Sequence, residues 1–125
     1  MLKQPAEAPE EGWYVSPVVF MDASMEMRIA REEIFGPVLT VIPYDEVSEA
    51  VRLANQSEYG LDGAIFGPPD EALMVARRLQ CGNVHINGAV YDVSMPFGGY
   101  KQSGIGREGG REGFEGFLEA KSIFL

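Results

Sequence analysis

The chain has 125 residues, of which 46% are hydrophobic, and its 19 acidic and 10 basic residues give a net charge of −9. This length and this hydrophobic content are typical of one globular domain with a packed core. The acidic balance argues against nucleic acid and anionic membrane surfaces as partners, because both carry negative charge.

The numbers of cysteine and histidine residues and the lengths of the apolar stretches exclude further classes of protein. With one cysteine and one histidine, the chain cannot form an internal disulfide or a zinc or iron–sulfur centre, so no metal site is expected. The N-terminus lacks the apolar block of a signal peptide, and no stretch reaches the roughly 20 apolar residues that span a bilayer. These features predict a soluble protein of the cytoplasm.

The first half of the chain predicts a polar lead-in followed by two strands. Residues 1–12 contain prolines and acids with almost no apolar residue, which is typical of disorder. Residues 13–20 form a short strand interrupted at Pro17, and residues 22–33 an irregular or briefly helical link. Residues 38–44 are apolar on both faces, as expected of a buried strand.

The middle of the chain predicts two helices that alternate with strands. Asp45 is a good N-cap for a helix that runs to about Gln56, a strand follows at 63–67, a second helix at 68–82 and a strand at 83–87. Gly82 is expected to end the second helix with a positive φ angle. The apolar helix faces are Val47, Ala50, Val51 and Ala54 in the first helix, and Ala72, Val75, Ala76 and Leu79 in the second.

Strands that alternate with helices through short links predict an α/β fold with a parallel sheet. Residues 95–117 are rich in glycine, and residues 118–125 close the chain with strand-like alternation. Gly104 to Gly109 match the dinucleotide pattern G-x-G-x-x-G, but no strand precedes them and the chain ends 16 residues later. We therefore interpret these glycines as a tight path between packed elements.

Two further residues invite a functional interpretation that their context disfavours. Cys81 is predicted at the C-terminal end of the second helix, where the helix dipole disfavours a thiolate, so a packed and inert cysteine is favoured. His85 has no acid or second ligand at a useful spacing in the sequence, which favours a hydrogen-bonded structural histidine.

The stretch EEIFGPV, residues 32–38, places a carboxylate and a ring two positions apart. If the backbone is extended there, the side chains of Glu33 and Phe35 point the same way. A carboxylate can accept two ribose hydroxyls while a ring packs on a flat heterocycle. On these residues alone, a solvated Glu33 with Phe35 in the core is the favoured alternative.

Three separated motifs favour the ligand-binding interpretation of Glu33 and Phe35 over the alternative. The segment MRIAREEIFGPVLTVIPYDEVSEAVRLAN, then YGL at 59–61, and finally PFGGYKQSGIGREGG resemble the C-terminal part of the NAD(P)-dependent aldehyde dehydrogenases, and the similarity runs from about Gly12 to Leu125. The resemblance implies that Glu33 holds the ribose on the nicotinamide side of the cofactor, NAD or NADP, and that Phe35 packs near the nicotinamide.

The resemblance also assigns a substrate tunnel. It implies that Asn87 opens the loop that lines this tunnel and that Phe97 contributes to the tunnel wall. Between them, Tyr91, Val93 and Met95 occupy the family's most variable segment, where plain loop packing is an equal alternative to shaping substrate choice.

The fold implied by the resemblance is α/β: a partial parallel-sheet lobe of the aldehyde dehydrogenase catalytic domain at 13–116, and a C-terminal assembly strand at 117–125. The family's nucleophilic cysteine motif, its general-base glutamate and its cofactor-binding domain are absent, so no catalytic residue is expected on this chain. We expect the chain alone to be inactive and to self-associate through its terminal strand. The alternative is a free-standing interaction module that docks on full-length aldehyde dehydrogenase subunits.

Overall fold

The structure is a computed structural model that describes residue 9 and residues 11–125. The chain divides into two compact units, Met1–Glu46 and Val47–Leu125, and the predicted lead-in at 1–12 lies mostly outside the described residues. The elements in chain order are β1 (Val18–Phe20), α1 (Arg28–Arg31), β2 (Val38–Thr40), α2 (Val47–Asn55), β3 (Asp62–Ile65), α3 (Pro69–Ala76), β4 (Asn83–Ile86), a 3₁₀ turn (Lys101–Ser103) and α4 (Gly110–Glu115).

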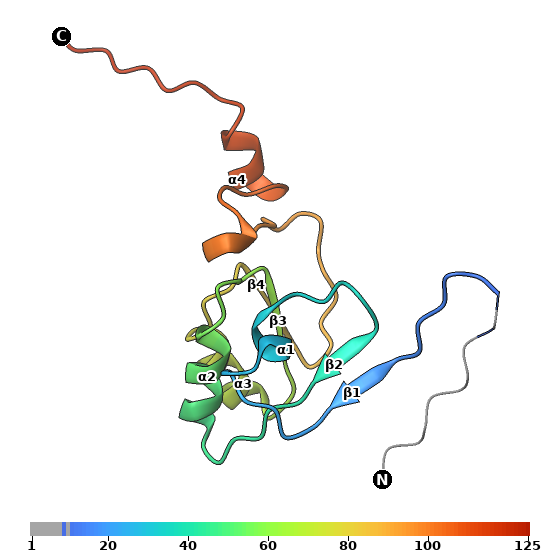
Figure 1. Ribbon diagram of the computed structural model, residues 1–125. Helices are drawn as coiled ribbons and strands as arrows, with labels where there is room; N and C mark the ends of the chain where they lie inside the picture. The colour runs from blue at the N-terminus through green and yellow to red at the C-terminus, as the bar shows by residue number, and fades with distance from the viewer. Residues whose placement is uncertain (1–8, 10) are drawn as a thin grey trace. The chain divides into compact units, whose positions relative to one another are not determined.

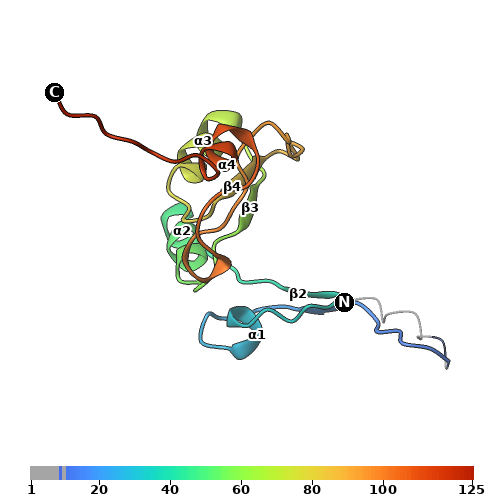
Figure 2. The same ribbon diagram turned by 90° about the horizontal axis from the view of Figure 1, so that it is seen from above.

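The first unit is built on a parallel pair of strands. β1 begins directly after Pro17 and pairs with β2 in the register Val18 to Val38, and Figures 1 and 2 show the two strands side by side. The connection between them carries α1, and the hydroxyl of Thr40 donates a hydrogen bond to the carbonyl of Ile29 at 3.1 Å. This bond ties α1 to β2.

The second unit contains a β-α-β arrangement. β3 and β4 pair in parallel, with Asp62 opposite Asn83 and Ile65 opposite Ile86, and α3 packs against both strands (Figure 2). α3 begins at Pro69, whose fixed φ suits the first helical position. Its Ala72 is buried, as the predicted apolar face requires.

The prediction of one parallel sheet is wrong in its extent. The described strands form two separate two-stranded sheets, β1–β2 and β3–β4. Apolar patterning identifies a strand but does not determine which strand lies next to it. The prediction that 38–44 is a buried strand is also wrong, because β2 covers three residues and Leu39 is 59% exposed.

The hydrophobic core is small. Among the described residues, the buried hydrophobic side chains are Ala23, Val51 and Ala72. The accessible surface is 10,651 Å², whereas a compact monomer of this mass exposes about 6,600 Å². The packed core expected from composition is therefore not completed within this chain.

The end of the second predicted helix differs from expectation. α3 ends at Ala76, six residues before Gly82, and Gly82 does not have a positive φ. Glycine is needed there for another reason, because a Cβ at Gly82 would lie 1.6 Å from the carbonyl oxygen of Gly98. Gly82 thus permits close approach of two backbones rather than capping a helix.

The predicted C-terminal strand is not formed in the single chain. Residues 118–125 have irregular backbone and are exposed throughout, and Figures 1 and 2 show them extending away from α4. A strand needs a hydrogen-bonded neighbour, and none is present for these residues in the described chain. Over the described residues, no helix combines the length and the apolar character needed to cross a bilayer.

Candidate functional site

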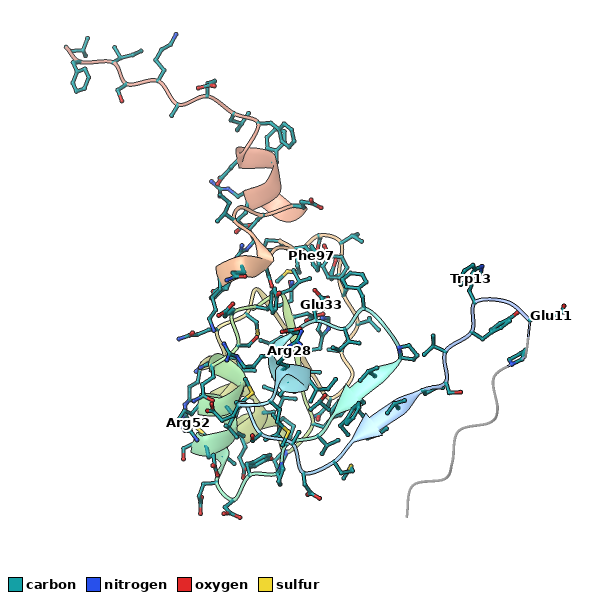
Figure 3. The ribbon with its side chains drawn as sticks, in the orientation of Figure 1. Glu11, Trp13, Arg28, Glu33, Arg52 and Phe97 are labelled. Carbon is teal, nitrogen blue, oxygen red and sulfur yellow. The ribbon has the colours of Figure 1, made fainter. Side chains whose placement is uncertain are left out.

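The stretch between α1 and β2 carries the predicted cofactor residues. The structure separates its two adjacent carboxylates. Glu32 is held by Arg28 through two hydrogen bonds of 2.8 Å, and this pairing lowers the pKa of Glu32. Glu33 lies one residue further, in the segment that leads to β2 (Figure 3), and is exposed with no hydrogen-bond or ion-pair partner in the described part of the chain. Its carboxylate is therefore free to accept hydrogen bonds from a ligand.

Phe35 does not continue an extended strand. Its φ angle is +53°, in the left-handed region, so the two-residue alternation used to orient it beside Glu33 does not apply. Gly36 and Pro37 follow, and the amide of Val38 donates to the carbonyl of Gly36 at 2.7 Å. After this turn, Phe35 is 92% exposed. The alternative interpretation, which placed Phe35 in the core, is therefore wrong. The ring is available to a ligand.

Asn87 directly follows β4, and its side chain makes two hydrogen bonds to the backbone of Gly67. Its amide nitrogen donates to the carbonyl of Gly67 at 2.9 Å, and its amide oxygen accepts from the Gly67 amide at 2.9 Å. This pair of bonds continues the β3–β4 ladder by one step through a side chain. Asn87 therefore holds the turn after β3 against the end of β4, a role that its predicted place in the tunnel did not anticipate.

Residues 88–97, here called the tunnel loop, contain the other predicted substrate residues. Two rings meet in it, since Tyr91 and Phe97 stack edge to face with 5.6 Å between centroids. Val93 and Met95 are exposed. Asp92 accepts hydrogen bonds from both the amide and the hydroxyl of Ser94, which lowers the pKa of Asp92.

The glycine-rich segment supports the tunnel loop. Phe97 and Glu108 exchange two backbone hydrogen bonds of 2.7 Å in an antiparallel bridge, and a Cβ at Gly109 would lie 3.0 Å from the carbonyl oxygen of Met95. A 3₁₀ turn rather than a strand precedes Gly104. The segment is a backbone path that packs on the loop, as predicted, and not a dinucleotide fingerprint.

The motifs YGL and PFGGYKQSG meet in space. The carbonyl of Gly60 accepts from the amides of Gly82 and Tyr100, and the amide of Gly60 donates to the hydroxyl of Ser103. The ammonium of Lys101 donates to the carbonyls of Asn55 and Ser57 at 2.7 and 2.8 Å, at the end of α2. These two motifs form a structural clasp within the second unit.

The surroundings of Cys81 disfavour a thiolate. It lies beyond α3, half-buried, with its sulfur 3.3 Å from the carbonyl oxygen of Asn83, to which the thiol donates. Burial, and next the charge of Asp62, raise the pKa of Cys81. These features favour the predicted inert cysteine, whereas its predicted place at the helix end is wrong, because α3 ends at Ala76.

His85 is hydrogen-bonded, as predicted, and an acid that its sequence spacing did not reveal lies next to it. Its Nε2 lies 3.2 Å from Oδ1 of Asp62, and its Nδ1 lies 2.7 Å from the carbonyl oxygen of Ala89. Asp62 is distant in sequence and comes close because β3 pairs with β4 in parallel. Among the described residues, no cluster of three or more metal-ligating side chains is found.

Comparisons with a family profile and with known proteins indicate the same family. The profile of the aldehyde dehydrogenase family matches residues 2–123. The chain is 51% identical over 115 residues to a 3-succinoylsemialdehyde-pyridine dehydrogenase of a Pseudomonas species, covering 91% of this chain and 24% of that protein. It is 50% identical to the geranial dehydrogenase of Castellaniella defragrans, covering 93% of this chain and 24% of that protein.

Solved structures that resemble this chain are also aldehyde dehydrogenases. An aldehyde dehydrogenase of Mycobacterium tuberculosis in complex with NAD⁺ superposes with a TM-score of 0.88 at 44% identity, covering 94% of this chain and 25% of that one. Aldehyde dehydrogenase C of Pseudomonas syringae, a mutant in complex with NAD⁺ and octanal, gives 0.87 at 50% identity, covering 91% and 24%. The chain thus spans about a quarter of the length of these relatives, and it belongs to the aldehyde dehydrogenase family.

Proposed function

We propose that this chain is the C-terminal part of a cytoplasmic NAD(P)-dependent aldehyde dehydrogenase, an enzyme that oxidises an aldehyde to a carboxylic acid. The family membership supports the reaction class. The observation that carries the assignment to this chain is the exposed, unpaired carboxylate of Glu33 in the stretch EEIFGPV, next to the paired Glu32. Glu33 is thereby available for a cofactor, whereas Glu32 is not.

The residues of this stretch fit a nicotinamide nucleotide. An ionised carboxylate accepts two ribose hydroxyls, and an exposed ring covers a flat base. When bound, the cofactor supplies the oxidising power of the reaction. In this proposal Glu33 orients the ribose, Phe35 packs near the nicotinamide, and the tunnel loop with Tyr91, Val93 and Met95 contacts the aldehyde.

The nucleophile and the general base belong to polypeptide outside these 125 residues. The one cysteine here has a raised pKa and points to a backbone carbonyl, which is the opposite of thiolate activation. Each catalytic group is needed in the same site. We therefore propose that the chain by itself does not turn over aldehyde.

A grafted enzyme tests this proposal. This chain replaces the matching segment of geranial dehydrogenase, to which it is 50% identical, and NADH formation from geranial is followed at 340 nm. We expect turnover, because the grafted part supplies cofactor and tunnel contacts and the host supplies the rest. A grafted enzyme that folds, binds NAD and forms no NADH would overturn the assignment.

A second candidate function is a docking module for full-length aldehyde dehydrogenase subunits, together with self-association. The favouring observation is the tail, residues 117–125, in which Phe117, Ile123 and Phe124 are largely exposed. An exposed apolar segment without a partner is a typical association site. Co-purification with a full-length subunit, lost on deletion of the tail, is the expected result for this function.

A further inference from the structure

The side chain of His85 bridges the start of β3 and the start of the tunnel loop. Its Nδ1 lies 2.7 Å from the carbonyl oxygen of Ala89, and its Nε2 lies 3.2 Å from Oδ1 of Asp62. The side chain is 24% exposed. Neither the motifs of the sequence nor the proposed cofactor contacts give this histidine a role.

Hydrogen-bond chemistry fixes the proton on one ring nitrogen. A backbone carbonyl oxygen only accepts, so Nδ1 carries the proton that is donated to Ala89. The carboxylate of Asp62 also only accepts when ionised. Both contacts are therefore satisfied when both ring nitrogens carry protons, and the bond to Ala89 persists in the neutral ring that is protonated on Nδ1.

The bridge lies where the chain changes direction. Asn87 and Gly88 follow β4 with φ angles of +52° and +78°, and the amide of Ala89 donates to the carbonyl of Ile86 at 3.1 Å. His85 reaches across this turn to the same residue. Asp62 is itself held by the amide of Gly63 at 2.9 Å, so a continuous set of bonds leads from β3 to the first residues of the loop.

We propose that His85 is a positioning residue for the aldehyde substrate: its bond to Ala89 fixes the start of the tunnel loop and so sets where Tyr91, Val93 and Met95 stand, while its contact with Asp62 orients the imidazole ring. The inference rests on the proposed function, in which this loop contacts the aldehyde. His85 touches neither substrate nor cofactor and acts through the loop.

The first test needs no activity. His85 is the one histidine of the sequence, so a long-range ¹H–¹⁵N spectrum of the labelled 125-residue chain contains one imidazole. We expect a protonated Nδ1 at neutral pH. An imidazole whose Nδ1 is unprotonated and whose Nε2 carries the proton would overturn the bridge.

The second test uses the grafted enzyme and two matched variants. In His85→Asn the amide nitrogen stands where Nδ1 stood and can still donate to Ala89. In His85→Gln the longer side chain reaches toward Asp62 and loses Ala89. We expect the KM for aldehyde to rise about threefold to tenfold in the Gln variant and to stay within about twofold in the Asn variant, as loss of one hydrogen bond predicts.

The pattern across substrates separates positioning from general damage. The KM for NAD and kcat are expected to stay unchanged in both variants. Equal effects of Asn and Gln, or a parallel rise in the KM for NAD, would overturn the inference. If the unsubstituted grafted enzyme forms no NADH, the proposed function fails instead, while the imidazole spectrum still decides whether the bridge exists.

Discussion

Left-handed backbone marks the motif residues. Four non-glycine residues among those described have positive φ angles, Asp22, Phe35, Asn87 and Lys101, and two of them, Phe35 and Lys101, lie in the three motifs that resemble the family. Asparagine tolerates this conformation, but phenylalanine and lysine do so at a cost of about 1–3 kcal/mol each. Lys101 is compensated by two hydrogen bonds of its ammonium, whereas the exposed Phe35 ring has no such contact, and uncompensated strain of this kind is typical of ligand sites.

The two adjacent glutamates provide a matched pair for testing cofactor contact. We expect Glu33→Gln in the grafted enzyme to lower kcat/KM for NAD about tenfold to a hundredfold, since charge-assisted hydrogen bonds to the ribose are lost. Glu32→Gln removes a surface ion pair with Arg28 and should change kcat/KM little. Steady-state kinetics with varied NAD measure both. Equal effects of the two variants would remove Glu33 from the cofactor site.

Cys81 should react slowly while the chain is folded. Because burial and Asp62 raise the pKa of its thiol, less thiolate is present near pH 8 than in an unfolded chain. The stabilisation linked to this raised pKa is complete below the thiol's ordinary pKa and is lost as the pH rises through the raised value. Alkylation followed by mass spectrometry should be slower in buffer than in urea. Faster alkylation in buffer would contradict the inert assignment.

Local sequence patterns predicted those helices and strands whose formation depends on residues close together in the sequence. The apolar spacing that includes Ala72 predicted α3, and short apolar runs predicted β3 and β4. Strand neighbours, the Asp62 to His85 contact and the left-handed turn at Phe35 depend on partners distant in sequence or on backbone detail that side-chain periodicity does not carry. For the same reason, the resemblance, which predicts a place for Asn87 at the tunnel, did not reveal its bonds to Gly67.

Gly82 gives a test of the clasp between elements. A Cβ at Gly82 would collide with the carbonyl of Gly98, whereas a Cβ at Gly67 would meet nothing within 4 Å. We expect Gly82→Ala to lower the free energy of unfolding by more than about 2 kcal/mol, because backbone cannot move aside cheaply. Gly67→Ala should change it by less than about 1 kcal/mol. Urea unfolding followed by circular dichroism measures both, and similar values would contradict the close approach.

At the scale of the whole molecule, most hydrophobic side chains of the described residues remain at least partly exposed to solvent. Three buried hydrophobic side chains among the described residues make a small core for a chain of this length. The chain exposes much more surface than a compact monomer of the same mass. Further protein surface, either the rest of an aldehyde dehydrogenase subunit or a second copy, is therefore expected to cover its exposed apolar side chains and to add to the stability of its fold.

The tail is the segment with which self-association is tested. Phe117, Ile123 and Phe124 are largely exposed, and the alternation of residues 118–125 suits pairing with a strand of another copy. We expect the chain to sediment as a dimer or larger species and to shift toward monomer when residues 117–125 are deleted. Replacing Glu119 and Lys121 by serine serves as a control that keeps the apolar residues. Unchanged association after the deletion would rule the tail out.

The account depends most on the claim that this chain supplies cofactor and substrate contacts but not the reactive sulfur. The most direct measurement is aldehyde-dependent NADH formation at 340 nm by the purified 125-residue chain with saturating NAD. The account predicts no turnover above a blank without protein, because Cys81 is held as a neutral thiol. Turnover that disappears in Cys81→Ser would contradict it.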